Sequence, residues 1–226
     1  MSYIWEKFNI KTMPAETLVY CDGLFREELS TLNDCNISKK YDLPVHIIYV
    51  GNLDNEQSLN INITADNQPV YLTINTENKK PAFLNIFIKN TGKNSELRGH
   101  ILLKNYSDLV VKCIAEHDVS NTGILLQTKI LGYQNSHSKI SATAVINKNC
   151  ENTVSDIRLS GLVDKTAQIR FTPQQKINSI PLSAEHSAYT FHSTDAQIEY
   201  LRTAGLGTGE IKNALTEAFI KDFNLF

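Results

Sequence analysis

The sequence contains few cysteines, and no two of them are close together. The four, Cys21, Cys35, Cys113 and Cys150, are scattered over 226 residues. Zinc ribbons and redox Cys-x-x-Cys motifs both need closely spaced pairs, so the spacing excludes these sites. We expect four free thiols that behave mostly as small hydrophobic side chains.

Long hydrophobic runs are also missing. A membrane-spanning helix needs about 18 or more consecutive apolar residues, whereas runs such as Val45–Val50 have the length of a strand. The opening residues MSYIWEKFNIK carry charges where a signal peptide needs an apolar stretch. We therefore expect a cytoplasmic protein with no membrane partner.

Neither sign of charge dominates. Lys and Arg number 22 and Asp and Glu number 24, which gives a formal net charge of -2. Such a balance provides no strong field for a polyanion, so we expect no nucleic-acid partner. Nucleophile elbows, HExxH motifs and Ser-His-Asp spacings are not visible, and the glycines of GLGTG at residues 205–209 do not follow a strand as in a phosphate loop. These absences predict a protein that is not an enzyme.

Short alternating or apolar runs separated by polar turn clusters fill residues 41–177. In LNINIT at residues 59–64, for example, the apolar side chains would face one way and the polar ones the other. The predicted strands are 45–50, 59–64, 70–76, 83–90, 100–105, 109–117, 123–131, 139–147 and 154–163. Strands at this spacing with no helices between them indicate a sandwich, a barrel or a β-helix. Outward Asn, Thr and Ser and the scarcity of Asn-Gly or Asp-Gly hairpin signals favour a stacked solenoid, although a sandwich with longer loops would look much the same.

The pattern changes to a helical period after residue 193. Thr194 and Gln197 have the spacing of a capping box, in which each side chain satisfies a backbone N–H at a helix start. The glycines at 205–209 predict the end of this helix. Its apolar stripe contains Ile198, Leu201 and Tyr200.

A second amphipathic helix should begin at Thr208 or Gly209. Its apolar face contains Ile211, Ala214, Leu215, Ala218, Phe219 and Phe223. Each helix is too short to be stable alone, so this face must pack either on the chain's own β domain or in a partner's groove. We accordingly divide the chain into a β core at residues 1–193 and a C-terminal helical segment at 194–226.

Two short groups combine a histidine with a carboxylate. Glu116, His117 and Asp118 end one predicted strand, and Glu185 precedes His186 shortly before the helices. A neighbouring carboxylate can fix an imidazole tautomer and make it a better metal ligand. Adjacent residues of a strand face opposite ways, however, so Glu185 and His186 would not share a site in an extended segment.

Two separated segments, LVYCDGLFREELS at residues 18–30 and a closing region that contains AEHSA at 184–188 and DAQIEYLRTAG at 195–205, together resemble the SufB/SufD family of iron–sulfur cluster assembly proteins. LVYCDGLFREELS at residues 18–30 is similar to a family phrase in which a strand runs into a D/N-G-x-F-x-x-x-L-S turn. Near the end, AEHSA at 184–188, DAQIEYLRTAG at 195–205, and Ala214 and Ala218-Phe219 are similar to the closing signature of the family. The order and spacing of these pieces carry the resemblance.

The resemblance implies a mainly β fold, a right-handed parallel β-helix followed by a small C-terminal helical pair. Members form homodimers or heterodimers, here with a SufB-like subunit, and dock an ABC-type ATPase, SufC, through their terminal helices. They act as scaffolds on which a transient iron–sulfur cluster is built, so no tightly bound cofactor is expected. The alternative is a non-catalytic β-solenoid interaction protein with no metal role.

Carried over by position, His186 matches the histidine implicated in cluster formation, and Glu185 matches the acidic residue before it. Ser187 stands where SufB-like chains have a functional glutamate, and Thr166 stands near their cluster-linked cysteine. The chain thus resembles a reduced, SufD-like member whose metal ligand would be His186. The residues that would bind the partner ATPase are Ile198, Tyr200, Leu201, Arg202, Ile211, Leu215 and Phe219.

Overall fold

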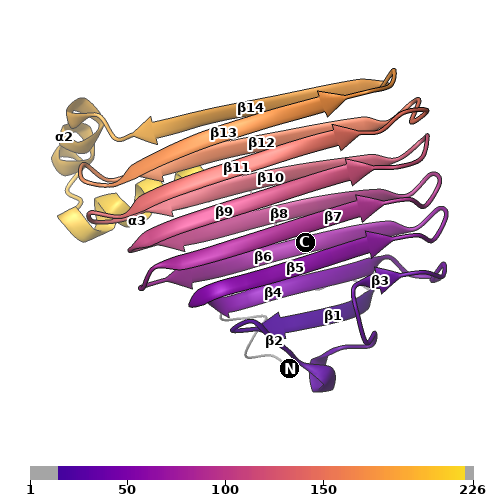
Figure 1. The fold of residues 1–226 in the computed structure, drawn as a ribbon. Helices are drawn as coiled ribbons and strands as arrows, with labels where there is room; N and C mark the ends of the chain where they lie inside the picture. Colours follow the sequence, from indigo (N-terminus) through magenta and orange to yellow (C-terminus); the bar gives the residue numbers. More distant parts are fainter. Residues whose placement is uncertain (1–14, 222–226) are drawn as a thin grey trace.

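The computed structural model describes residues 15–221, and these form two β-sheets followed by a helical pair (Figure 1). Sheet A contains, in spatial order, β14 (Ser183–His192), β12 (Val154–Val163), β10 (Gly123–Gly132), β8 (Glu96–Asn105), β6 (Pro69–Asn78), β4 (Val45–Asn52), β1 (Glu16–Cys21) and β2 (Leu24–Phe25). Sheet B contains β13 (Gln168–Ile177), β11 (His137–Ile146), β9 (Asp108–His117), β7 (Ala82–Asn90), β5 (Asn55–Ile63) and β3 (Asn36–Ile37). The helices are the short 3-10 helix η1 (Glu27–Leu29), α2 (Asp195–Thr203) and α3 (Thr208–Ile220).

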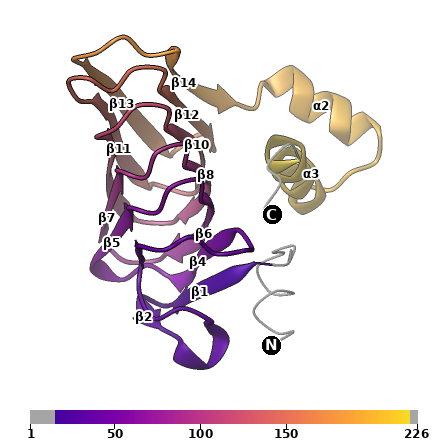
Figure 2. The same cartoon turned by 90° about the vertical axis from the view of Figure 1, so that its right-hand side faces the viewer.

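From β2 onward, successive strands alternate between the two sheets, so each coil of the chain places one strand in each sheet. Every strand pair is parallel except β1 with β2. The sheets lie face to face, with both helices beyond sheet A (Figure 2). The protein is therefore a β-solenoid, which confirms the stacked-coil alternative over an antiparallel sandwich or barrel.

The core lies between the sheets and is built by stacking equivalent positions of successive coils. β11, for instance, buries every second residue. Across sheet A, Leu72, Gly99, Leu126 and Ile157 lie in register at one inward level, and all four are buried. The alternation in the sequence thus reports the two faces of each strand, as predicted.

The Asp-Gly dipeptide at residues 22–23 forms the one two-residue hairpin turn in the described chain. Asp22 has φ 53° and Gly23 has φ 78°, both in the left-handed region. Asp and Gly tolerate that region best, and the turn joins β1 to the two-residue strand β2. The scarcity of such dipeptides elsewhere fits a fold in which the other described connections pass from one sheet to the other.

The periodicity did not predict β13 and β14 as strands. Their inward positions contain Pro173, Gln175, His186 and Thr190, which interrupt the apolar alternation. They are strands because they pair in register with β11 and β12 of the preceding coil, although they lack a hydrophobic pattern. Among residues 15–221, no helix is long and apolar enough to cross a membrane.

Candidate functional site

The last coil of the solenoid, formed by β13 and β14, is open on its far side. Neither strand pairs with a further strand among the described residues. Side chains that would face a following coil are therefore exposed, and in the connecting turn Ile180 and Leu182 are 78% and 72% exposed. An open strand edge with exposed apolar side chains is a site for pairing with another chain.

His186 lies in this open coil. It is in register with Ile157, which is buried in the core of the preceding coil, so the imidazole occupies an inward position that no later coil covers. Glu185 is in register with Asp156 on the outer face of sheet A, and its carboxylate accepts a hydrogen bond from Ser183 Oγ at 3.2 Å. The two residues face opposite ways, as the sequence predicted for an extended segment.

Thr166 does not lie beside His186. Val163 at the end of β12 pairs with His192, and His186 precedes His192 by six positions, or about 20 Å along the strand. Thr166 follows Val163 in the turn to β13, where its hydroxyl donates to Asp164 Oδ1 at 3.0 Å. The structure therefore separates the two positions that the resemblance connects with cluster chemistry.

Glu116, His117 and Asp118 do not form a site either. His117 is fully buried, and its Nδ1 lies 2.8 Å from Thr122 Oγ1. Asp118 instead pairs with Lys89 Nζ at 2.7 Å on the outside of sheet B. Within residues 15–221 no group of three or more His, Cys, Asp and Glu side chains is arranged to hold a metal ion.

Two buried histidines make stability depend on pH. Burial lowers the pKa of His46 and of His117 from 6.5 to about 4. As the pH falls, each imidazole binds a proton in the unfolded chain before it does so in the folded protein. The free energy of unfolding is therefore highest above pH 6.5 and declines between pH 6.5 and about 4. The decline is at most about 3 kcal/mol for each histidine. Denaturant titrations across this range should show the decline.

The double variant His46→Gln/His117→Gln separates this effect from the titration of carboxylates. It should flatten the pH dependence relative to the wild-type protein, whereas Thr172→Gln, a neutral exchange at an exposed position, should leave it unchanged. An equal decline in all three proteins would contradict burial of neutral imidazoles.

The cysteines are not exposed reactive thiols. All four are free, and Cys35, Cys113 and Cys150 are buried. Burial raises the pKa of Cys113 to about 12, so it stays protonated at neutral pH. This confirms the prediction of free thiols in packing roles.

The helical pair begins at the predicted capping box. Gln197 N–H donates to Thr194 Oγ1 at 3.2 Å, and Thr194 N–H donates to Gln197 Oε1 at 3.0 Å. Gly205, with φ 89°, follows the end of α2. The second helix, α3, starts at Thr208 as predicted, while Phe223, assigned to its apolar face, lies outside the described residues.

α3 packs on the outer face of sheet A of its own chain. Ile211 is buried, and Phe219 and Ile220 pack against Leu102 and Leu131 of β8 and β10. Phe219 also meets Phe191 of β14 edge to face, with ring centroids 5.8 Å apart. The sequence left open whether this apolar face packs on the chain's own β domain or in a partner's groove. Most of the face packs on the chain's own sheet.

Lys129 of β10 anchors the end of α3. It is only 4% exposed, its ammonium donates to the Phe219 carbonyl at 2.5 Å, and it lies 5.1 Å from the centroid of the Phe219 ring. A helix C-terminus has unpaired carbonyls and a partial negative charge, so a lysine there both donates a hydrogen bond and neutralises charge.

Lys129→Met should loosen α3 while leaving the solenoid folded. Methionine fills a similar volume but leaves the Phe219 carbonyl without this donor, which costs about 1–3 kcal/mol. Hydrogen exchange of the α3 amides should accelerate roughly tenfold or more, with no change in β6 or β8. Lys112→Met, at an exposed lysine over Phe83 on sheet B, serves as the control, and equal exchange in α3 of both variants would contradict the anchor.

Part of the helical pair remains free. α2 buries no residue completely, and Tyr200 is 73% exposed. Beside it, a shallow groove between α2 and α3 is lined by Ala196, Gln197, Tyr200, Leu201 and Leu215. Of the residues predicted to bind a partner, Tyr200, Leu201 and Leu215 therefore border this groove, whereas Ile211 faces the chain's own sheet.

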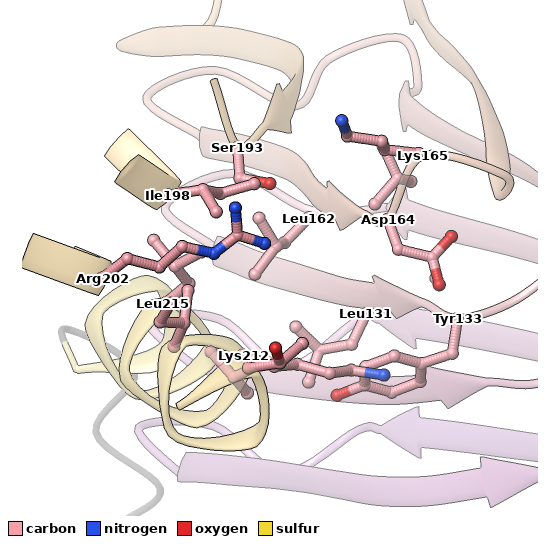
Figure 3. A pocket seen from close by; sticks show the side chains of 15 residues that line it. Leu131, Tyr133, Leu162, Asp164, Lys165, Ser193, Ile198, Arg202, Lys212 and Leu215 are labelled. Atoms are coloured by element: carbon pink, nitrogen blue, oxygen red, sulfur yellow. The ribbon is translucent and has the colours of Figure 1, made fainter. Parts of the chain in front are cut away.

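A cavity of about 220 Å³ lies between sheet A and parts of α2 and α3. Its apolar surface comes mainly from Leu131, Leu162, Val163, Ile198, Ile211 and Leu215. Charged side chains stand around it: Asp164, Lys165, Arg202 and Lys212 (Figure 3). No pattern in the sequence predicts this cavity, because its walls come from segments distant along the chain.

No protein-family model matches the sequence, and no curated protein matches it. The resemblance to the SufB/SufD family therefore rests on the quoted segments and stays a prediction.

Proposed function

We propose that this protein is a scaffold subunit of an iron–sulfur cluster assembly complex that pairs with a second β-solenoid subunit and docks a SufC-like ABC-type ATPase through its helical pair. The observation that carries the proposal is the open last coil. Among residues 15–221, β13 and β14 end the solenoid with unpaired edges, and His186 lies at an inward position that no further strand covers. A buried coil end would support neither pairing nor an accessible imidazole.

Pairing at the open coil follows from the hydrogen-bonding needs of a sheet edge. The outer N–H and C=O groups of β13 and β14 meet no further strand in the described chain, and strand addition from another subunit satisfies such groups. The partner is a second copy of this chain or a SufB-like subunit. Either would cover the apolar side chains exposed at the end of the core.

Docking of the ATPase would use the groove between α2 and α3. Tyr200 and Leu201 offer exposed apolar surface there, and Arg202 adds a cation beside it. Because Ile211 and Phe219 pack on sheet A, the helical pair is already held in place, and binding a partner would cost little conformational entropy.

The described residues do not by themselves make a cluster-binding site. His186 is the one predicted ligand at the open coil, and Thr166 and Ser187 offer no thiolate or carboxylate. His186 can therefore supply one ligand to a nascent cluster, with the remaining ligands coming from the paired subunit. Such a cluster is cargo of the complex and not a resident cofactor.

Co-expression with a SufC-like ATPase tests the docking half of the proposal. The wild-type protein should form a complex that survives size exclusion, and Tyr200→Glu/Leu201→Glu should abolish it by placing charge in an apolar contact. The matched control is Glu199→Gln/Thr203→Glu, at exposed α2 positions outside the residues that line the groove. Failure of the wild-type protein to bind, or equal binding by all three proteins, would count against docking.

Anaerobic reconstitution with iron and sulfide tests the chemical half. The paired subunits should gain visible absorbance that His186→Ala weakens, while His137→Ala leaves it intact. A colourless wild-type complex would favour the second candidate, a non-catalytic β-solenoid interaction protein with no metal role. The observation that favours this candidate is the distance between His186 and Thr166.

A further inference from the structure

We propose that the cavity between the helical pair and sheet A binds a small amphipathic anion, a carboxylate or phosphate monoester with a short hydrocarbon chain. This inference goes beyond the scaffold function and does not depend on it. It rests on the apolar lining of the cavity and on the balance of charge at its rim.

The cavity suits a short hydrocarbon chain. Leu131 and Leu162 of sheet A form one wall, and Ile198, Ile211 and Leu215 of the helices form the opposite one. A volume of about 220 Å³ exceeds the roughly 150 Å³ of an engineered apolar cavity that binds benzene. Burying a chain of roughly six to eight carbons there would favour binding, because each methylene group leaves water for an apolar surface.

Two of the four charged rim residues already have partners, and Asp164 stays an ionised carboxylate. Asp164 Oδ1 accepts hydrogen bonds from the N–H groups of Thr166 and Ala167 at 3.0 Å, and its Oδ2 accepts from Gln134 N–H at 2.5 Å. Although partial burial opposes ionisation, these donors lower the pKa of Asp164. Lys165 pairs with Asp195 at 2.7 Å. Neither residue needs a ligand.

Arg202 and Lys212 are left as the cations that face the opening. The guanidinium of Arg202 extends from α2 toward Leu162 (Figure 3), with only a long contact of 3.7 Å to Glu199. The ammonium of Lys212 lies 4.2 Å from the centroid of the Tyr133 ring. Among residues 15–221 no carboxylate lies within ion-pair distance of Lys212.

The cations Arg202 and Lys212 lie at the rim beside apolar surface, which is an arrangement that suits an amphipathic anion. The N-terminus of α3 is not the anion site, because Glu210 already accepts the Gly207 N–H at 2.7 Å. The anionic group would instead lie between Arg202 and Lys212, with its chain against Leu162 and Leu215.

Calorimetric titration of the full chain with octanoate, octyl phosphate, octylammonium and octanol tests the proposal. The two anions should bind, with octylammonium and octanol at least about tenfold weaker, because each loses the charge-assisted contacts. Lys212→Met should weaken octanoate binding about tenfold, and Lys139→Met, at an exposed lysine on sheet B, should leave it unchanged.

Leu162→Trp fills the cavity and should abolish binding while Arg202 and Lys212 remain. Circular dichroism and the thermal midpoint show whether this variant folds. If it does not fold, the comparison of the four ligands and the Lys212→Met variant still test the proposal. Octylammonium binding as tightly as octanoate, octanoate binding unaffected by Lys212→Met, or no binding of either anion would overturn the proposal.

Discussion

In the proposed pairing through the open coil, Ala188→Lys combined with Thr190→Lys should convert the assembly into free subunits. Both residues lie on β14 at exposed inward positions of the open coil, in register with Leu159 and Gly161 of the preceding coil. In an isolated subunit the new ammonium groups reach water, so the fold should tolerate them. A second subunit seated on the coil end would instead bury them without a partner.

The expected effect on pairing is large. Burial of an unpaired ammonium costs several kcal/mol after relaxation, so two of them should raise the dissociation constant at least about a thousandfold, which corresponds to about 4 kcal/mol. Light scattering coupled to size exclusion should then report the mass of one subunit in place of two. Where the wild-type chain pairs only with a SufB-like subunit, the same measurement applies to that mixture.

The control places the same two charges on the same coil but on its outer face. Thr172 and Gln174 of β13 are exposed and point away from the core, so Thr172→Lys/Gln174→Lys should leave the dimer intact. Undisturbed assembly of the Ala188→Lys/Thr190→Lys protein would show that the open coil is not the pairing surface.

A second large effect is expected in the core, where Gly99 and Leu126 share one space. They are in register on β8 and β10, and a Cβ added at Gly99 would lie 2.5 Å from Leu126 Cδ2. Gly99→Ala should therefore destabilise the protein by overpacking, by about 1–3 kcal/mol. Leu126→Ala should cost about 2–5 kcal/mol by leaving a cavity.

The double variant should be more stable than the sum of the single effects predicts. The methyl group of Gly99→Ala enters space that Leu126→Ala vacates, so the coupling energy should be about 1 kcal/mol or more in the favourable direction. Urea denaturation of the four proteins measures it. Gly209→Ala, in helix α3 where an added Cβ meets nothing within 4 Å, is the control and should not destabilise the protein, since alanine favours a helix. Strict additivity of the two core variants would contradict the direct contact.

Local chemistry predicted most of the elements. Each of the nine predicted runs is a strand, since side chains on a strand alternate between buried and exposed faces whatever the sheet topology. The capping box at Thr194 and the start of α3 were also predicted, because a cap depends on residues within one turn of the helix. The opposite facing of Glu185 and His186 followed from the same geometry.

The last coil could not be predicted in this way. Phe171 at an inward position of β13 is followed by Pro173 and Gln175, and His186 interrupts β14. An end coil has no later coil to cover it, so burial does not select apolar residues there. The positions that carry the proposed function are therefore those where the hydrophobic pattern is weakest.

The sequence alone determined that the nine runs within residues 45–163 form strands with two faces and that two helices follow residue 193, because both depend on neighbours along the chain. Only the tertiary structure decided that the strands stack in parallel coils, since the same alternation suits an antiparallel sandwich. It also decided that α3 lies on its own sheet, anchored by Lys129. That surface combines β8, β10 and β14, which are distant in sequence, and no local pattern brings them together.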